Sequence, residues 1–422
     1  MRPLEIVKDL LKQILYQGME FSHALRLAFK DNQADKEYAS LVSAIVGCEL
    51  RHHFLFARIV DDLSGDYSED QKCLLFAALA NTLFLKRLEQ DDVFAYVRAS
   101  FNEEQANVIE KLLAYQDSPR DLIPESIPPE SLEYLSLRFN TPEWLVKMWQ
   151  KHFGRGVTYK LLKKNNKPQL QSCRVNTLMT TTKEVLDDNP EFREAPISDM
   201  VIYQGKAPIR KNAFFQSFDV FLLKMAIKEM MDKVCGDDVG EAFLYSYEDN
   251  SIIREFFLKF QTRIGLNLGV PNTDERLDIS KIIRYNKLTN VNFFGAHPSE
   301  MKAAISRPQD LVIVNPQSSN FDLIRAYPDY LLHFKRESID ELVAAQKETL
   351  ENCSSYVGED GILVYIVSTI NRKEGRSLIM DFLDKHRDFV LIEEKQRFPF
   401  DPLDTALYYA IMKRKVEAAA SE

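Results

Sequence analysis

The runs DLVIVNPQSS (residues 310–319) and GILVYIVSTIN (residues 361–371) each predict a buried strand that ends in a polar loop. Between them, apolar residues recur at helical spacing from Glu337 to Asn352. Strand, helix and strand in this order predict a parallel crossover, and the functional residues of open α/β sheets lie at the carboxyl ends of such strands. In this chain those ends are residues 316–318 (Pro-Gln-Ser) and residues 368–370 (Ser-Thr-Ile).

Both runs resemble motifs of the cytosine-C5 RNA methyltransferases of the NusB/Sun type, a group within the NOL1/NOP2/Sun superfamily that acts on 16S ribosomal RNA. The tripeptide Tyr-Pro-Asp at residues 327–329 and Gln346 are also shared with them. That family carries Asp-Ala-Pro-Cys-Ser-Gly at the first strand end and Ser-Thr-Cys-Ser/Thr-Ile at the second. The second cysteine attacks C6 of cytosine, and the first helps to release the product. The matching positions here are Gln317 and Ser368, so both cysteines are replaced.

The two replacements matter because attack on a pyrimidine carbon needs a soft nucleophile with an accessible anion, which a thiolate supplies near neutral pH. A serine hydroxyl has no comparable anion without a strong adjacent base, and a glutamine amide is not a nucleophile. The family's aspartate before the first motif is replaced by Val314, and only Glu374 is retained from the acidic pair after the second. We therefore expect no catalytic residue here and interpret the chain as an inactive relative, a pseudoenzyme.

An alternative interpretation keeps the activity but moves its residues. Cys353, near the end of the helix between the two runs, would then be the nucleophile of an active S-adenosylmethionine-dependent methyltransferase. A cysteine on a helix face is more often a buried core residue, by roughly five to one. The five cysteines form no CxxC pair and the histidines show no metal-binding spacing, so we expect free thiols and no metal.

Residues 1–125 show helical spacing of apolar residues nearly throughout. With the motif that begins at Asp35-Lys36, they resemble the all-α NusB-like domain at the front of this family, which contacts RNA and protein partners. Here the segment carries 14 Lys or Arg against 21 Asp or Glu, so a protein partner is as much expected as phosphate. A protein-interaction scaffold that acts through this domain is a third interpretation.

For residues 126–208, the resemblance implies linker helices followed by a small α/β, RRM-like subdomain. The string PEWLVKMWQKHFG at residues 142–154 is the most specific match to the family, and RVNTL at residues 174–178 begins the RNA-contacting subdomain in relatives. Residues 126–212 form the basic part of the chain, with 14 Lys or Arg against 9 Asp or Glu. We expect this part to contact RNA, ribosomal RNA by family, through seven residues. They are Lys163, Lys164, Lys167, Arg174, Asn176, Arg210 and Lys211.

For residues 209–422, the resemblance implies a Rossmann-like class I methyltransferase domain, and the residue pattern predicts a helix from Asp219 to Val234 before its first strand. In the family this strand runs into Asp-x-Cys-Ala-Ala-Pro-Gly-Gly-Lys-Thr, whose glycines let the backbone approach S-adenosylmethionine. Here AFLYSY at residues 242–247 runs into EDNSIIR, and no glycine occurs from residue 241 to residue 264. We expect the side chains of Ile252, Ile253 and Arg254 to fill the space that a methionine moiety needs.

A second strand, at residues 263–268, ends in Gly-Val-Pro-Asn where the family places the aspartate that holds the ribose hydroxyls. We therefore expect weak or no binding of S-adenosylmethionine. The last elements, at residues 388–393 and 405–413, predict the antiparallel end of a methyltransferase sheet. The positions that match the family's cofactor residues are Tyr245, Ser246, Glu248, Asp249 and Asp274.

The bulk composition is that of an ordinary globular protein, with 45% hydrophobic and 28% charged residues in 422. No apolar run approaches the length of a membrane span. The first residues, MRPLE, lack the apolar core of a signal peptide. These features predict a cytoplasmic protein without a membrane partner.

Overall fold

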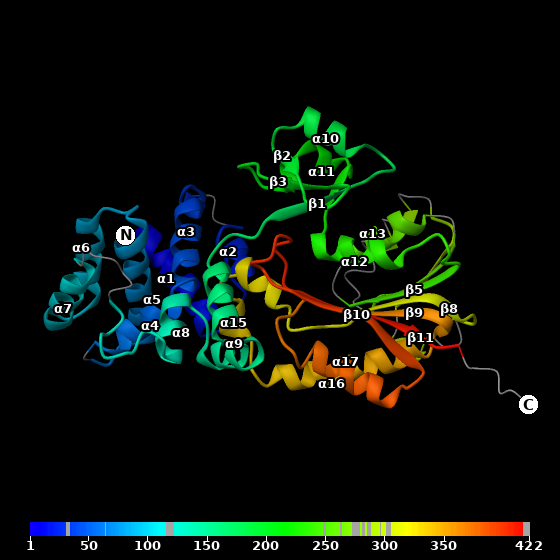
Figure 1. Cartoon of the computed structure of the whole chain (residues 1–422). Coiled ribbons are helices and arrows are strands. Elements are labelled where there is room, and N and C mark those ends of the chain that lie inside the picture. Colours follow the sequence, from blue (N-terminus) through cyan, green and yellow to red (C-terminus); the bar gives the residue numbers. More distant parts are fainter. Residues whose placement is uncertain are drawn as a thin grey trace, which may run out of the picture. The chain divides into compact units, whose positions relative to one another are not determined.

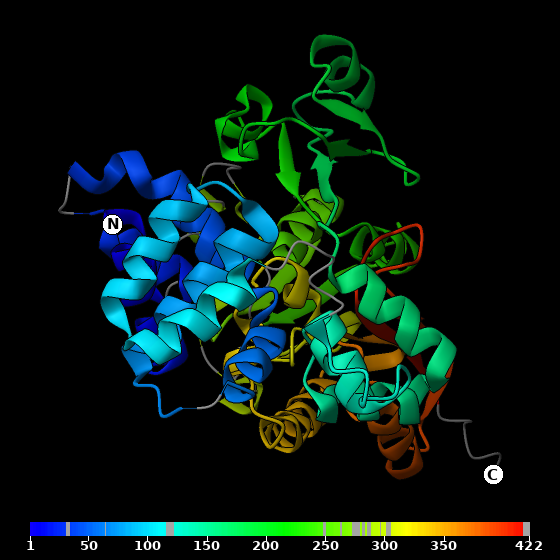
Figure 2. The same cartoon turned by 90° about the vertical axis from the view of Figure 1, so that its left-hand side faces the viewer.

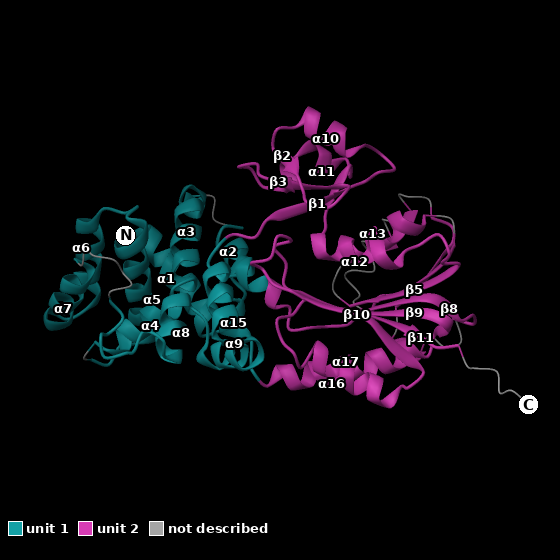
Figure 3. Cartoon of the chain, in the orientation of Figure 1, with its two compact units in different colours: residues 1–167, 323–336 teal, residues 168–322, 337–422 magenta. Residues whose placement is uncertain are grey.

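The computed structural model of the chain contains two compact units (Figure 3). Unit 1 consists of residues 1–167 and 323–336, and unit 2 consists of residues 168–322 and 337–422. The structure describes residues 1–30, 34–63, 65–114, 122–247, 250–261, 264–271, 279–280, 283–284, 288–295, 297–300 and 305–416.

Unit 1 is helical, as its apolar periodicity predicts, and its helices pack against one another (Figures 1 and 2). Ser68 and Asn102 each form a capping box, so two helices begin where polar residues interrupt the periodicity. Its core contains fully buried Leu4, Val46 and Phe56. The helices are α1 (Arg2–Leu15), α2 (Phe21–Ala28), α3 (Ala39–Leu50), α4 (His53–Asp61), α5 (Glu69–Leu79), α6 (Gln90–Ser100), α7 (Glu103–Leu113), α8 (Leu132–Phe139), α9 (Glu143–Asn165) and α15 (Tyr330–His333).

The specific tryptophan-containing string lies in α9 and packs within unit 1. Trp149 is fully buried, as expected for a core residue. The Trp144 ring stacks on Phe334, with ring centroids 6.3 Å apart. Asp329, which lies in the same returning segment as Phe334, accepts a hydrogen bond of 2.8 Å from the backbone N–H of Phe21. Residues 323–336 therefore return to unit 1 although they follow a strand of unit 2.

Unit 2 contains a four-stranded antiparallel sheet in the order β2-β3-β1-β4. The predicted helix from Asp219 to Val234 is wrong in its first part, because Val220 to Leu222 pair with β1 as an edge strand. The helix begins only at Met225. The elements of this part are β1 (Gln171–Val175), α10 (Thr182–Asp188), β2 (Phe192–Glu194), β3 (Met200–Tyr203), η4 (Ile209–Lys211), α11 (Ala213–Gln216), β4 (Val220–Leu222) and α12 (Met225–Val234).

Unit 2 also contains a seven-stranded sheet in the order β10-β11-β9-β8-β5-β6-β7. β11 is antiparallel to both neighbours, and the other pairs are parallel. This is the Rossmann-like arrangement that the sequence predicts, with its antiparallel end. The strands are β5 (Glu241–Ser246), β6 (Gly265–Gly269), β7 (Val291–Phe294), β8 (Gln309–Asn315), β9 (Val357–Val367), β10 (Phe389–Arg397) and β11 (Leu407–Arg414).

Helices cover both faces of the large sheet (Figure 1). On one face α12 and α13 (Asn250–Phe260) bury Met230 and Phe256 against the strands. On the other face α16 (Ser338–Ser354) and α17 (Arg376–Lys385) bury Leu350 and Leu378. The predicted crossover is confirmed, because β8 and β9 are parallel and α16 connects them.

The observed units differ from the three expected segments 1–125, 126–208 and 209–422. The middle segment is divided, since α8 and α9 belong to unit 1 and the four-stranded sheet belongs to unit 2. Among the described residues, no helix has both the length and the apolar character required to cross a membrane.

Candidate functional site

The carboxyl ends of β8 and β9 hold the two positions that match the family cysteines. Gln317 is exposed, and its backbone carbonyl accepts a hydrogen bond of 2.8 Å from Gln346 Nε2. Ser368 is buried, and its Oγ accepts a hydrogen bond of 2.8 Å from Lys224 Nζ. The same ammonium lies 3.2 Å from the buried Asp322 carboxylate. The serine hydroxyl is therefore held by a charged donor.

A buried carboxylate behind these positions ties their loops together. Glu374 is fully buried, and its two oxygens accept four hydrogen bonds of 2.7–3.1 Å. The sequence comparison singled out Glu374 and Gln346 as shared with the family, and the structure brings the two residues together. The four donors are Ser319 N, Gln346 Nε2, Thr369 Oγ1 and Asn371 Nδ2.

The thiol of Cys353 is buried in the core and is not presented at this site. It lies on the inner face of α16, is fully buried, and packs with Leu350 and Tyr356 in the core. Burial raises the pKa of the Cys353 thiol well above its ordinary value. A thiol that neither ionises readily nor contacts solvent cannot attack a bound base. The structure therefore favours the core interpretation of this cysteine.

The end of β5 is the region that would face a cofactor. Ser246 is fully buried, and its Oγ donates a hydrogen bond of 3.2 Å to Asn315 Oδ1. Tyr245 is buried too, and burial raises the pKa of its phenol. These two side chains stabilise the contact between β5 and β8. The expected cofactor positions Glu248, Asp249 and Asp274 lie outside the described residues.

The structure shows other contacts for the three bulky side chains that were expected to fill the methionine space. Ile252 and Ile253 are fully buried on α13 and pack into the core of the large sheet. The Arg254 guanidinium lies 5.5 Å from the ring centroid of Phe218 and 6.0 Å from that of Phe221. All three side chains are therefore accounted for by contacts inside unit 2.

The residues present still do not fit S-adenosylmethionine as the family holds it. Residues 265–271, at the end of β6, contain no carboxylate that could bind ribose hydroxyls. The 241–264 stretch contains no glycine for a close backbone approach. Ser246, at the end of β5, is already hydrogen-bonded to Asn315.

The expected RNA-binding residues fall into two groups in different units. Lys163, Lys164 and Lys167 lie at or just beyond the end of α9 in unit 1, and Lys163 also contacts the Tyr159 ring. The basic pair Arg210-Lys211 on η4 of unit 2 is exposed.

Arg174 and Asn176 must be removed from the expected RNA-contacting set. The Arg174 side chain is 4% exposed, and its Nε donates a hydrogen bond of 2.8 Å to Glu255 Oε2. Its Nη1 donates to the backbone carbonyls of Val175 and Asp199. Asn176 is buried as well. The guanidinium links the small sheet to α13, and a phosphate cannot reach it in this state.

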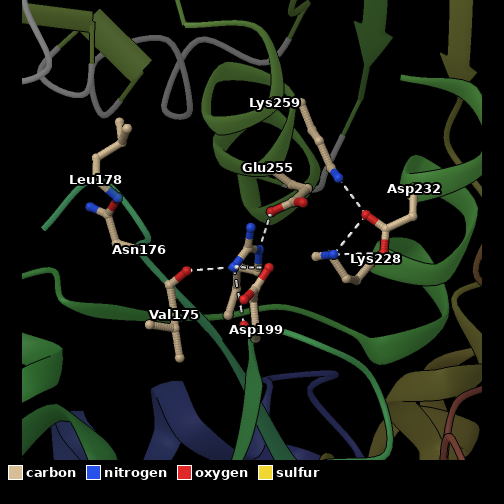
Figure 4. Close-up of polar contacts among 9 residues, drawn as sticks. Val175, Asn176, Leu178, Asp199, Lys228, Asp232, Glu255 and Lys259 are labelled. Carbon is tan, nitrogen blue, oxygen red and sulfur yellow. Dashed lines mark hydrogen bonds and ion pairs between the residues drawn. The ribbon is translucent and has the colours of Figure 1, made fainter. Parts of the chain in front are cut away.

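The sequence alone did not reveal the charged network around the ion pair of Arg174 and Glu255. Glu255 is fully buried, and burial raises the pKa of its carboxyl although Arg174 acts against that shift. Lys228 is also buried and donates two hydrogen bonds of 2.6 Å to Asp232, which Lys259 contacts as well (Figure 4). Burial opposes ionisation of Asp232, but hydrogen bonds from the two lysines lower its pKa. The i,i+4 spacing of Lys228 and Asp232 was the available signal.

The chain is similar in sequence to proteins named ribosomal RNA small subunit methyltransferases and in fold to solved methyltransferase structures. Residues 141–188 match the family model "Methyltr_RsmF/B-like, ferredoxin-like domain". The chain is 24% identical over 60% of its length to the probable ribosomal RNA small subunit methyltransferase B of Bacillus subtilis, and covers 58% of that protein. It is 22% identical over 60% of its length to the Thermus thermophilus ribosomal RNA small subunit methyltransferase B, of which it covers 57%. The chain thus spans less than two thirds of these relatives.

Solved structures show the same fold. The crystal structure of PH0851 matches with a TM-score of 0.75 and 16% identity, over 98% of this chain and 99% of that one. A methyltransferase homolog protein from Pyrococcus horikoshii matches with a TM-score of 0.57 and 13% identity, over 68% of this chain and 100% of that one. At these identities the likeness concerns the fold.

Proposed function

We propose, from the relationship of this chain to the Sun-family ribosomal RNA small subunit methyltransferases B and F, that it is an RNA-binding member that does not transfer a methyl group to cytosine. The observation that carries this proposal is the state of Ser368. A buried hydroxyl fixed by an ammonium group occupies the position of the family nucleophile.

The contacts of Ser368 explain why the hydroxyl is a poor nucleophile. Activation of a serine requires a base that removes its proton. Lys224 instead donates a hydrogen bond to Ser368 Oγ, and the same ammonium forms an ion pair with the Asp322 carboxylate. The position that matches the product-releasing cysteine is Gln317, whose amide cannot form a covalent bond to the base. Both chemical roles are thus unfilled.

The framework around the two positions supports retention of a binding function. Glu374 and Gln346 still fix the loops after β8 and β9, and the Rossmann-like sheet is intact. The exposed Arg210 and Lys211 supply positive charge beside the small sheet, whose first strand lies within the segment matched by the family model. A chain that keeps the fold but lacks the reactive groups can still recognise RNA without modifying it. S-Adenosylmethionine, the methyl donor implied by the family, is expected not to bind.

Charge reversal on η4 tests the RNA-binding part of the proposal. We expect the double variant Arg210→Glu and Lys211→Glu to bind a small-subunit ribosomal RNA fragment more weakly than the unmodified protein. Its slope of log affinity against log salt should fall by about one to two, because each lost phosphate contact removes about one released counterion. Fluorescence anisotropy titrations at several salt concentrations measure both quantities.

The matched control is Lys385→Glu, which reverses an exposed charge on α17. It should change affinity much less than the double variant does. If the control loses half as much binding free energy as the double variant, in proportion to the charge reversed, net charge alone governs binding and η4 is removed from the proposed RNA face.

A further inference from the structure

Phe218 combines two properties that folding alone does not favour. Its ring is 43% exposed, and its backbone has φ of 63°, in the left-handed region. A bulky residue in that region is strained by contact between its Cβ and the backbone. Such strain persists only where the surrounding structure imposes it, and it is concentrated at functional sites.

Asn176 imposes this conformation. It is 8% exposed, and its Nδ2 donates a hydrogen bond of 3.2 Å to the backbone carbonyl of Phe218. Its Oδ1 accepts one of 3.3 Å from the backbone N–H of Leu178 (Figure 4). One buried amide therefore fixes two loops of the small sheet next to each other. Asn176 was expected to contact RNA directly, and here it positions residues that are exposed.

Both loops carry exposed apolar side chains, and the aromatic ring on one of them lies beside a cation. Leu178 and Met179 are 51% and 56% exposed. The Arg254 guanidinium lies 5.5 Å from the centroid of the Phe218 ring and restrains it. Because the cation already restrains the ring, little further conformational entropy is lost when a ligand stacks on the exposed face of the ring.

The charge of these loops selects the class of ligand. Residues 176–183 and 200–218 together contain Lys183, Lys206, Arg210 and Lys211 and no Asp or Glu. Glu184, Asp199 and Asp219 border these ranges, and Asp219 accepts a hydrogen bond from Ser217 Oγ. An exposed aromatic ring beside the Arg254 guanidinium, on a loop that also carries Arg210 and Lys211, matches single-stranded RNA, in which bases stack on rings while phosphates meet cations.

We infer that Phe218, supported by Arg254 and carried on a loop that Asn176 ties to the loop of Leu178, is a stacking site for an unpaired nucleobase of RNA. This inference rests on the proposed RNA-binding function and adds the form of RNA that the small sheet prefers. A base-paired helix offers no free face to the ring, so the site discriminates single-stranded from double-stranded RNA.

The test compares Phe218→Ala, Phe218→Trp and Leu222→Ala for binding to oligouridylate and to a duplex RNA. Leu222 is 44% exposed on β4 of the same sheet, which makes it a matched control for lost apolar surface. We expect Phe218→Ala to lose about tenfold in affinity for oligouridylate and little for the duplex. Phe218→Trp should keep its affinity and show quenched tryptophan emission on binding, and Leu222→Ala should bind as the unmodified protein does.

The experiment distinguishes a failure of the proposed RNA-binding function from a failure of the stacking site. If the unmodified protein binds neither RNA at low salt, the proposed function is wrong and this inference falls with it. If it binds oligouridylate but Phe218→Ala binds equally well, RNA binding stands and the stacking site is overturned. Unquenched emission from Phe218→Trp at saturating RNA would likewise overturn the stacking site, even if affinity is lost elsewhere.

Discussion

Replacing Arg174 by alanine is expected to lower the free energy of unfolding by about 3–5 kcal/mol, because it leaves a buried carboxylate without its counter-charge. Glu255 is fully buried, and among the described residues its Oε1 has no hydrogen-bond partner. Its Oε2 accepts from Arg174 Nε at 2.8 Å. The variant also loses the hydrogen bonds that hold the carbonyls of Val175 and Asp199. Denaturant unfolding followed by circular dichroism measures the loss.

The pH dependence of the destabilisation by Arg174→Ala shows whether the unpaired carboxylate of Glu255 causes it. Burial raises the pKa of Glu255, so the folded chain binds that proton more tightly than the unfolded chain does. The contribution of Glu255 to stability is therefore fully present below its unfolded pKa and is lost as pH rises through its folded pKa. Without Arg174 the folded pKa rises further. The destabilisation should thus be smaller at about pH 5 than at about pH 8, where the carboxylate is charged.

The control for the Arg174 prediction removes both charges. The double variant Arg174→Met and Glu255→Leu should recover much of the lost stability, because paired apolar side chains of similar volume leave no buried ion. A loss for Arg174→Ala that is below about 1 kcal/mol and independent of pH would contradict the buried ion pair.

Replacing Glu374 by alanine is expected to cost about 3 kcal/mol or more of unfolding free energy, since four buried donors lose their acceptor. The donors come from the loop after β8, from α16 and from the loop after β9. Glu374→Gln should also destabilise, because an amide places an N–H₂ group toward donors such as Asn371 Nδ2. Chemical denaturation of the purified variants measures both effects.

Glu341→Ala is the matched control, because Glu341 is an exposed acid in the first turn of α16. It should shift stability by less than about 1 kcal/mol. If Glu374→Ala unfolds at the same denaturant concentration as this control, the carboxylate does not organise the loops after β8 and β9.

The fold was largely predictable because buried strands and helices leave direct patterns in the sequence. Residues 311–314 are apolar on both faces, as a central parallel strand requires, and they form the centre of β8. Helical spacing from Glu337 predicted α16 within two residues. The polar tips of both runs correctly marked the edge of the sheet that holds Gln317 and Ser368.

The errors arose where three-dimensional contacts override local patterns. Arg174 lies in the basic part of the chain, yet a charge count cannot distinguish a solvated arginine from one paired with Glu255, which lies 81 residues away in sequence. Val220 to Leu222 continue a helical pattern, but pairing with β1 makes them a strand. The return of residues 323–336 to unit 1 depends on tertiary contacts such as that of Asp329 with Phe21, and no local composition marks it.

Calorimetric titration of the purified protein with S-adenosylmethionine is the most direct test of the central claim that this chain has lost methyl transfer. The absence of a glycine turn after β5 and of a carboxylate at residues 265–271 predicts no saturable heat up to about 1 mM cofactor. A Kd near 1 µM, worth about 8 kcal/mol of binding free energy, would contradict the account and return this chain to the active methyltransferases.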